Sequence, residues 1–260
     1  MTEHTGRPDA GPTPSRPRPA RATTDHDMKR LFDICVGLLL LLIFALPMLA
    51  CIVVLRFTGE GNVFFLQDRV GKHGDYFKVF KFVTMAVGSE TRGTIDITIR
   101  NDPRVLPVGK FLRMAKLNEL PQILNVLKGD MSVVGWRPLM PRGFGDYPED
   151  VKQKIVEAKP GLTGIGSIVF RDEEAIVTEA MDNGKDLIAA YRDDILPYKG
   201  AVELWYNEHR SIFSDLKIIF LTAYAIVAPG NRLVFKWFKG LPEPQSPLVR
   251  KHTGFDAASK

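Results

Sequence analysis

Residues 31–57 read LFDICVGLLLLLIFALPMLACIVVLRF, and this run decides how the chain is organised. From Ile34 to Leu55 it carries no charge. As a helix, at about 1.5 Å per residue, the uncharged part would be roughly 33 Å long, which is enough to cross the apolar core of a bilayer. A helix in a water-soluble protein would need a polar face, and this run has none. The run therefore predicts a membrane helix.

The course of this helix through the membrane is open. Pro47 lies inside the run, where the missing N–H bends or breaks a helix. Basic residues flank the run on both sides: Arg16, Arg18, Arg21, Lys29 and Arg30 before it, and Arg56, Arg69, Lys72, Lys78 and Lys81 after it. Basic residues mark the cytoplasmic side, so basic residues on both flanks are what a helix that enters, bends at Pro47 and returns to the same face would show. A straight span has the same hydropathy. We expect Lys29 and Arg30 to contact lipid headgroups.

The regions around this anchor differ in composition. Residues 1–27 include PTPSRPRPARATT and almost nothing apolar, which predicts a disordered tail. The anchor then occupies residues 28–57, a folded domain residues 58–230, and a basic tail residues 231–260. With 45% hydrophobic and 25% charged residues over 260 positions, wholesale disorder is excluded. The net charge of +5 fits a membrane surface or an anionic substrate as well as nucleic acid. The two cysteines, Cys35 and Cys51, lie in the apolar run and exclude a disulfide framework.

The pattern past residue 58 predicts a mainly helical α+β domain. Residues 63–66 and 76–82 are typical of short strands joined by the turn GKHGD. Residues 118–128 predict a helix that Asn118 would cap and Gly129 would end. Residues 172–198 are charged and compatible with helix. The apolar stretch 212–227 contains too few consecutive uncharged residues to span a bilayer. It is therefore a core helix or one that lies along the membrane surface.

One dense block could carry chemistry: residues 101–139, NDPRVLPVGKFLRMAKLNELPQILNVLKGDMSVVGWRPL. Its charged residues are Arg104, Lys110, Arg113, Lys116, Lys128 and Arg137, with the carboxylates Asp102, Glu119 and Asp130. Cations beside a few carboxylates suit a phosphorylated substrate held with a divalent metal. Similar mixtures also cover ordinary helix surfaces. The sequence contains no Walker A loop, GxGxxG, GxSxG or HExxH motif.

Several segments match, in order, those of a known family. They are KRLFD (29–33), Pro47, FLQDRVGKHGDYFKVFKF (65–82), VGKFLRMAKLNELPQILNVLKGDMSVVGWRP (108–138), PGLTG (160–164) and DLKIIFLT (215–222). The chain resembles a bacterial sugar transferase of the monotopic phosphoglycosyl transferase family. The LNELPQILNVLKGDMSVVG stretch is specific, because no helix or strand periodicity demands it.

The resemblance implies both a function and a fold. Such enzymes transfer a sugar 1-phosphate from a nucleoside diphosphate sugar, usually UDP-linked, to polyprenyl phosphate, with release of UMP. This is the membrane-committed first step of exopolysaccharide, capsule or O-antigen assembly. The family uses Mg²⁺, a re-entrant membrane helix broken at a proline, and interfacial amphipathic helices. Its catalytic domain, here residues 58–230, lies on the cytoplasmic face of the inner membrane. The usual mechanism passes through a phosphosugar on an Asp that immediately precedes a Glu.

The chain departs from the family at the nucleophile. Asn118-Glu119 stands where the Asp-Glu pair is usual, and an amide is a very poor nucleophile toward phosphorus. Asn118 could orient substrate while Glu119 attacks or acts as a base, or Asn118 could simply cap a helix. Alternatively the protein is a catalytically inactive membrane scaffold of glycan assembly.

Three further positions differ from the family pattern. Val83 replaces an expected arginine, and Trp136 could stack on a base or sugar. The stretch IGSIVFRDEEAIV replaces a glutamine-containing one, so residues 171–174 are either an altered recognition or metal patch or a solvated helix start.

The resemblance assigns roles to particular residues. Asn118 and Glu119 are the candidate catalytic pair. The candidate phosphate contacts are Arg113 and Arg137, with Lys81 and Arg104 behind them, although each of the four could instead be a surface residue. Glu119 and Asp130 are the candidate Mg²⁺ ligands, although Asp130 could instead pair with Lys128. The expected partners are a UDP-sugar, polyprenyl phosphate and membrane lipid, and not nucleic acid. The sugar and the oligomeric state are left open.

Overall fold

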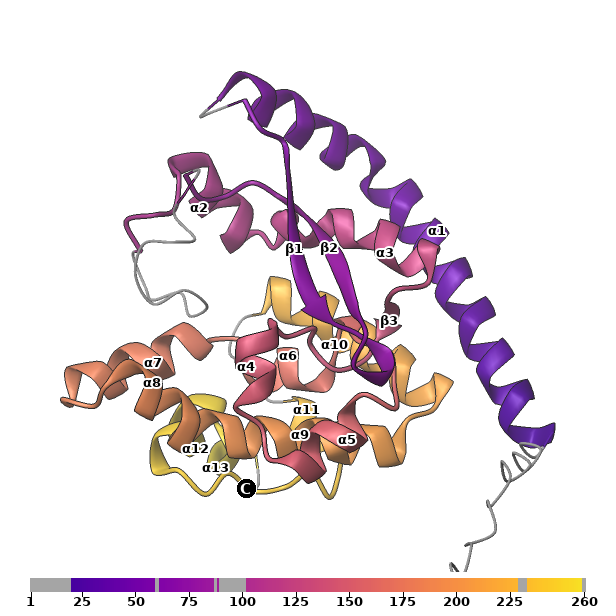
Figure 1. The fold of residues 1–260 in the computed structure, drawn as a ribbon. Helices are drawn as coiled ribbons and strands as arrows, with labels where there is room; N and C mark the ends of the chain where they lie inside the picture. The colour runs from indigo at the N-terminus through magenta and orange to yellow at the C-terminus, as the bar shows by residue number, and fades with distance from the viewer. Residues whose placement is uncertain (1–19, 59–60, 87, 89–101, 229–232, 259–260) are drawn as a thin grey trace, which may run out of the picture.

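The computed structural model describes residues 20–58, 61–86, 88, 102–228 and 233–258. Its first element is α1 (Ala20–Phe57), a continuous helix that curves along one side of the molecule (Figure 1). Residues 20–27 are therefore helical, and the prediction that they belong to a disordered tail is wrong; residues 1–19 lie outside the described residues. Pro47 lies within α1 without interrupting it. The helix bends rather than breaks.

Small β elements and many short helices follow α1. In chain order they are β1 (Phe64–Val70), β2 (Tyr76–Phe82), α2 (Pro107–Met114), a 3-10 helix (Leu117–Gln122), α3 (Ile123–Lys128), β3 (Ser132–Val134), α4 (Pro141–Gly145), α5 (Glu149–Ile155), β4 (Gly161–Thr163), α6 (Ile165–Val169), α7 (Glu173–Asp182), α8 (Leu187–Ala190), a π-helical turn (Tyr191–Ile195), α9 (Leu196–His209), α10 (Ile212–Val227), α11 (Leu233–Trp237), α12 (Pro247–Thr253) and α13 (Phe255–Ala258). The predicted α+β class is confirmed.

The β1–β2 hairpin is the first framework of the site. The strands are antiparallel, with Phe64 opposite Phe82 and Val70 opposite Tyr76. The turn between them uses the left-handed region at His73 and at Gly74, where φ is 61° and 86°. Both predicted strands are present, and β1 is longer than expected. The hairpin carries Lys81 on β2 toward the 3-10 helix.

A two-stranded parallel sheet, β3 with β4, is the second framework. Ser132 pairs with Gly161 and Val134 with Thr163. Gly135 follows β3, and a Cβ there would lie 2.4 Å from the carbonyl oxygen of Lys159. Only glycine permits this approach. The tight packing fixes the start of the segment that carries Arg137.

The C-terminal residues belong to the core. Val234 of α11 and Val249 of α12 are 3% and 0% exposed and lie in the same apolar cluster as Val202 of α9 and Ile218 of α10. The prediction that residues 231–260 form a basic tail is therefore wrong for 233–258. Apolar burial of this kind stabilises a domain by about 25 cal/mol per Å², so these helices are an integral part of it.

The N-terminal part of α1 docks on the domain through Arg30. Its guanidinium donates to the carbonyl oxygens of Val126 and Leu127, each at 2.6 Å, which completes the C-terminus of α3. Gly37 allows close contact here, because a Cβ would lie 3.0 Å from Leu127 Cδ2. Arg30 thus binds protein groups, which corrects the expectation of a headgroup contact.

Lys29 joins a buried group that we call the anchor cluster: Lys29, Asp33, Tyr206 and Asp215. Lys29 Nζ lies 3.0 Å from Asp33 Oδ1 and 2.7 Å from Asp215 Oδ2. The Tyr206 hydroxyl donates to Asp215 Oδ1 at 2.5 Å. Asp33 also accepts from the Ser132 hydroxyl and the backbone N–H of Val133, at 2.9 and 3.0 Å. The cluster ties α1 to β3, α9 and α10, so Lys29 too is used by the protein.

The C-terminal part of α1 contacts the same domain. Met48, Cys51 and Leu55 are buried in one cluster with Phe82 of β2 and Leu112 of α2. Between the two contacts the helix exposes apolar side chains: Leu38, Leu39, Leu42, Ile43 and Leu46. By length and composition α1 could cross a bilayer over Asp27–Phe57, and 17% of its most apolar window is buried. A long apolar surface is therefore left uncovered.

Candidate active site

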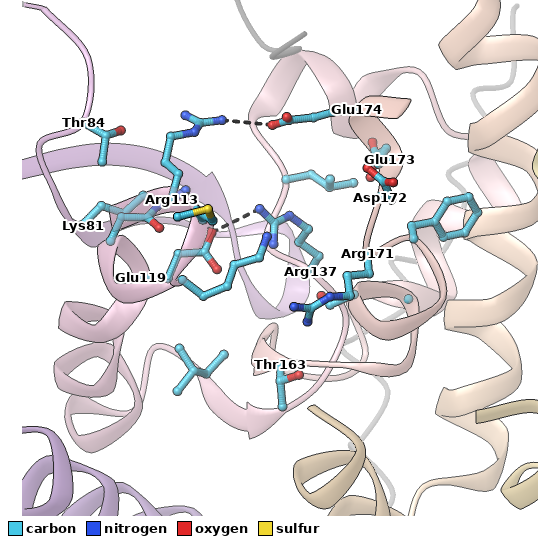
Figure 2. Close-up of a pocket in the computed structure, with 18 of the residues that line it drawn as sticks. Lys81, Thr84, Arg113, Glu119, Arg137, Thr163, Arg171, Asp172, Glu173 and Glu174 are labelled. Carbon is cyan, nitrogen blue, oxygen red and sulfur yellow. Dashed lines mark hydrogen bonds and ion pairs between the residues drawn. The ribbon is translucent and has the colours of Figure 1, made fainter. Parts of the chain in front are cut away.

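A cavity of about 1550 Å³ lies between two walls of the domain. One wall comes from β2, α2, the 3-10 helix and the segment after β3. The other comes from α6, the start of α7 and the residues around α9 (Figure 2). Six residues with predicted roles line it together: Lys81, Arg104, Arg113, Asn118, Glu119 and Arg137. The sequence separates some of them by more than 50 positions, and the fold brings them to one place.

The 3-10 helix positions Glu119, and its start overturns one prediction. Lys116 takes the left-handed conformation, with φ of 57°, and the 3-10 helix begins at Leu117. Asn118 is thus inside the helix and does not cap it, because the turn at Lys116 moves the helix start before residue 118. A non-glycine residue in this region carries strain of order 1–3 kcal/mol, which is common at functional sites. Asn118 and Glu119 both line the cavity.

Glu119 is the centre of a group that we call the cavity cluster: Lys81, Lys116, Glu119 and Arg137. Arg137 donates to Glu119 Oε1 at 3.2 Å, and Lys81 Nζ lies 3.8 Å from the same oxygen. Burial alone would raise the pKa of Glu119. The charges of Arg137, Lys81 and Lys116 outweigh burial and lower this pKa to about 2. Glu119 is therefore ionised at neutral pH.

At Lys81, burial has the larger effect on the pKa, whereas at Glu119 the nearby charges together do. Burial lowers the pKa of Lys81 to about 7, and although Glu119 opposes this, the charges of Arg69, Arg137 and Arg113 add to it. Glu119 alone does not offset burial together with these cations. The cluster is thus poor in negative charge, and an anionic ligand would supply what it lacks.

Arg113 and Arg104 lie farther along the same wall. Arg113 is 3.4 Å from Glu174 on the opposite wall. Arg104 pairs with the buried Asp102 at 2.6 Å, and this hydrogen bond lowers the pKa of Asp102. Arg104 is therefore anchored by its neighbour, whereas Arg113 reaches across the cavity mouth.

The opposite wall contains a pair that the sequence did not reveal. Lys199 Nζ lies 2.7 Å from Glu173 Oε2 and donates to the Tyr191 hydroxyl at 3.2 Å. All three residues line the cavity. Glu173 belongs to the 171–174 segment already singled out. Lys199 and Tyr191 carried no signal, because residues on different helices and 26 positions apart share no spacing rule.

Two predicted roles do not fit the geometry. Asp130 pairs with Lys128 at 3.1 Å and accepts from Asn125 Nδ2 at 3.2 Å, and it is not among the cavity-lining residues. Trp136 is 1% exposed, and its indole N–H donates to the carbonyl oxygen of Ala158 at 3.0 Å. Trp136 is a core residue, so the prediction that it stacks on a base or sugar is wrong.

The residues offer a Mg²⁺ ion limited support. Within the described ranges, no three His, Cys, Asp or Glu side chains are grouped to hold a metal. Glu119 is a single carboxylate. Mg²⁺ commonly binds one or two carboxylates together with substrate phosphates, so a site shared between Glu119 and a phosphorylated ligand fits the chemistry.

Comparison with known proteins gives the chain a family. The model of the family "Bacterial sugar transferase" matches residues 24–229. The chain is 38% identical over 198 residues to a UDP-glucose:undecaprenyl-phosphate glucose-1-phosphate transferase of Klebsiella pneumoniae, covering 75% of this chain and 39% of that protein. It is 31% identical over 214 residues to an undecaprenyl-phosphate galactose phosphotransferase of Salmonella typhimurium, covering 77% of this chain and 40% of that protein.

A third relative is closer in length. The exopolysaccharide production protein ExoY of Rhizobium meliloti is 31% identical over 214 residues, covering 76% of this chain and 84% of that protein. The family match covers the cavity cluster and the docked part of α1. The chain therefore belongs to the bacterial sugar transferase family.

Proposed function

We propose that this protein transfers a sugar 1-phosphate from a UDP-sugar to polyprenyl phosphate, releasing UMP and priming exopolysaccharide, capsule or O-antigen assembly. The observation that carries the proposal is the cavity cluster, in which three cations surround the single carboxylate Glu119 beside a long exposed apolar helix. The relatives named for UDP-glucose and undecaprenyl phosphate support the choice of substrates.

The cations fit the charge of the reactants. A UDP-sugar and polyprenyl phosphate both carry phosphate, so they repel each other unless cations lie between them. Lys81, Arg113 and Arg137 line the cavity and would contact these phosphates. Arginine can bind two phosphate oxygens at once, which orients as well as neutralises. Arg104 is held by Asp102 and would act at the edge.

The reaction needs no general base. An oxygen of polyprenyl phosphate bonds to the phosphorus that carries the sugar, the bond from that phosphorus to the bridging oxygen breaks, and the bridging oxygen leaves with UMP. The attacking oxygen is already ionised at neutral pH. With a pKa of about 2, Glu119 is a poor base, and it would serve as a nucleophile or as the charge that orients Lys81 and Arg137.

Two routes follow, direct transfer and a phosphosugar on Glu119, and neither uses Asn118 as nucleophile. Mass spectrometry of protein incubated with UDP-sugar alone separates them. We expect no adduct on residue 118 of the wild type, whereas Asn118→Asp supplies a carboxylate there and should gain the mass of the sugar phosphate. A wild-type adduct mapped to Asn118 would refute this assignment.

Mg²⁺ would be held by Glu119 together with the diphosphate of the donor. When bound there, it would neutralise charge on the departing nucleotide phosphate. Asp130 is not needed for this role, because it is paired with Lys128 outside the cavity lining.

The course of α1 supports a helix that does not span the membrane. Arg30 near one end and Leu55 near the other both contact the same domain. If α1 crossed the bilayer, this domain would have to reach both faces. A helix that dips in and returns, with the domain on the cytoplasmic face of the inner membrane, avoids this conflict. The exposed apolar residues Phe213, Leu216 and Phe220 of α10 would rest on the same surface.

Cysteine accessibility tests this topology. Single cysteines beside Met28 and Thr58 should both react with a membrane-impermeant reagent from the cytoplasmic side. Labelling of the two from opposite sides would establish a spanning helix instead.

The activity is tested with protein in nanodiscs, Mg²⁺, undecaprenyl phosphate and a panel of UDP-sugars, by measuring UMP. We expect release that depends on the acceptor for at least one donor. No release across the panel, with an Asp-Glu relative active in parallel, would favour the inactive scaffold that Asn118 otherwise suggests.

A further inference from the structure

A buried lysine holds Glu173 in a fixed position. The Lys199 side chain is 4% exposed, and its ammonium contacts Glu173 Oε2 and the Tyr191 hydroxyl at 2.7 and 3.2 Å. The same ammonium lies over the rings of Phe170 and Tyr191, 5.7 and 5.5 Å from their centroids. Hydrogen bonds and cation–π contacts thus fill the surroundings of this lysine. The direction of the Glu173 carboxylate is set by α9 rather than by solvent.

The carboxylate remains open to the cavity. The Glu173 side chain is 27% exposed and lines the cavity. A carboxylate has about four lone-pair positions. Lys199 occupies one on Oε2, and the Tyr191 hydroxyl also hydrogen-bonds to this carboxylate, so about two remain. Further hydrogen-bond donors can therefore reach Glu173 from the cavity side.

A purely structural role explains this pair less well. The pair does join α7 to α9, but Val177 and Val202 on the same helices are already fully buried in one apolar cluster. Replacing a buried ion pair by apolar residues is often neutral or stabilising. A carboxylate whose direction is fixed at a cavity wall is placed to accept hydrogen bonds from a ligand.

The position opposite the cavity cluster indicates what Glu173 recognises. Figure 2 shows Arg137 between Glu119 on one side and Asp172 with Glu173 on the other, and both Glu119 and Glu173 act electrostatically on Arg137. Phosphates belong with the cations on the Glu119 side. A carboxylate repels phosphate and accepts hydrogen bonds only, so its natural partners are hydroxyl or N–H groups.

We propose that Glu173, positioned by Lys199, selects the donor by accepting a hydrogen bond from a hydroxyl or N–H group on its sugar ring. This inference rests on the proposed function, since it names the part of the UDP-sugar that the wall containing Glu173 would contact. Glu173 is the contact residue, and Lys199 is a positioning residue that acts through it.

The first test compares Glu173→Gln with Glu179→Gln. Glu179 lies on the same helix, α7, and its carboxylate pairs with Lys251 and His252 of α12. We expect Glu173→Gln to raise the KM of the preferred UDP-sugar on the order of 10- to 100-fold. The affinity for UDP, which has no sugar, should stay within about twofold. An unchanged ratio of kcat/KM between the preferred sugar and its epimers would overturn the proposal.

The positioning role is tested by Lys199→Met and Lys199→Arg. Lys199→Met should raise the KM for UDP-sugars while kcat and UDP affinity change little, and Lys199→Arg should recover part of the loss. A uniform fall in kcat for all donors, equal in both variants, would contradict it.

The wild type provides a test that needs no variant to fold. Donors that lack single hydroxyl or acylamino groups should include at least one that is rejected by on the order of 10-fold or more in kcat/KM. Equal use of every such donor would overturn the inference while leaving the proposed function intact. Absence of turnover with all donors, the complete one included, would overturn both.

Discussion

The anchor cluster and the cavity cluster are both groups of charged residues, yet they differ in how the charges are matched. In the anchor cluster, donors of the protein bind both carboxylates, and the Asp33 and Asp215 side chains are 4% and 1% exposed, although Lys29 is 29% exposed. In the cavity cluster, several cations share one carboxylate, and the Glu119 side chain is 20% exposed. The first cluster is complete without a ligand, and the second is not.

This difference separates a structural join from a binding site. A buried carboxylate with all its hydrogen bonds satisfied holds two elements together, and removing one partner leaves the other uncompensated. A partly exposed group of excess cations is stabilised when an anion binds. Substitutions in the anchor cluster should therefore lower stability, and substitutions in the cavity cluster should lower ligand affinity and turnover.

Glu119→Gln should cause the largest loss of activity. The neutral amide keeps the shape but removes the one negative charge between Lys81 and Arg137, so UMP release should fall on the order of 10²- to 10³-fold. The unfolding temperature should change little. Turnover within a few-fold of wild type would show that the cavity cluster does not carry the chemistry. Glu179→Gln, on α7, is the matched control.

Asp215→Asn should cause the largest loss of stability. It weakens the bond from Tyr206 and leaves Lys29 without one of its buried partners, at a cost of about 3 kcal/mol in the free energy of unfolding. Denaturant unfolding in detergent measures this. The exposed pair of Lys78 with Asp68 is the control, since Asp68→Asn should cost less than about 1 kcal/mol.

A loss of UDP affinity in folded Asp215→Asn would break the comparison, because the anchor cluster would then act on the site. Equal losses in the free energy of unfolding for Asp215→Asn and Asp68→Asn would also break the comparison.

Donor binding should weaken as pH rises through about 7. The pKa of Lys81 in the free protein is lowered to about 7, so the ammonium is charged below that pH and neutral above it. A phosphate favours the charged form, and binding near this pH should therefore take up a proton. Loss of one charged contact corresponds to about tenfold in the dissociation constant. Calorimetry in buffers of different ionisation enthalpy measures both effects.

Lys81→Arg is the variant that sharpens this result. The guanidinium stays charged, so the fall in affinity around pH 7 should disappear. An identical pH profile in Lys81→Arg would assign the titration to another group.

Lys116→Asn should have the smallest effect: stability should stay equal or rise, and UDP affinity should fall. Asparagine tolerates the left-handed conformation that Lys116 adopts at φ of 57°, so stability should stay equal or rise by up to about 1 kcal/mol. The cavity cluster loses one cation, and UDP affinity should fall a few-fold. Lower stability together with unchanged UDP affinity would place Lys116 outside the cluster.

The sequence predicted elements whose residues follow local rules. The helix at residues 212–227 is α10 with the same bounds, because its caps and apolar run lie within one segment. The strand at residues 76–82 is β2, also as predicted. Five of the six cations of the block 101–139 line one cavity, and Lys128 pairs with Asp130 elsewhere.

Contacts across the chain could not be predicted in this way. Lys29 and Arg30 flank an apolar run. Nothing in the neighbouring sequence indicates that they contact Asp215 and the end of α3. The left-handed turn at Lys116 displaced the expected cap at Asn118. Lys199 of α9 binds Glu173 at the start of α7, and no local rule relates two residues 26 positions apart.

The most direct test of the account is UDP binding to nanodisc-held protein, measured by calorimetry at increasing salt. We predict saturable binding that weakens with salt and falls at least 100-fold in the Arg113→Gln/Arg137→Gln double variant, because each arginine is a charge-assisted contact of about 1.5–3 kcal/mol. UDP affinity that is the same in the double variant as in the wild type would contradict the claim that this cavity receives the donor's phosphates.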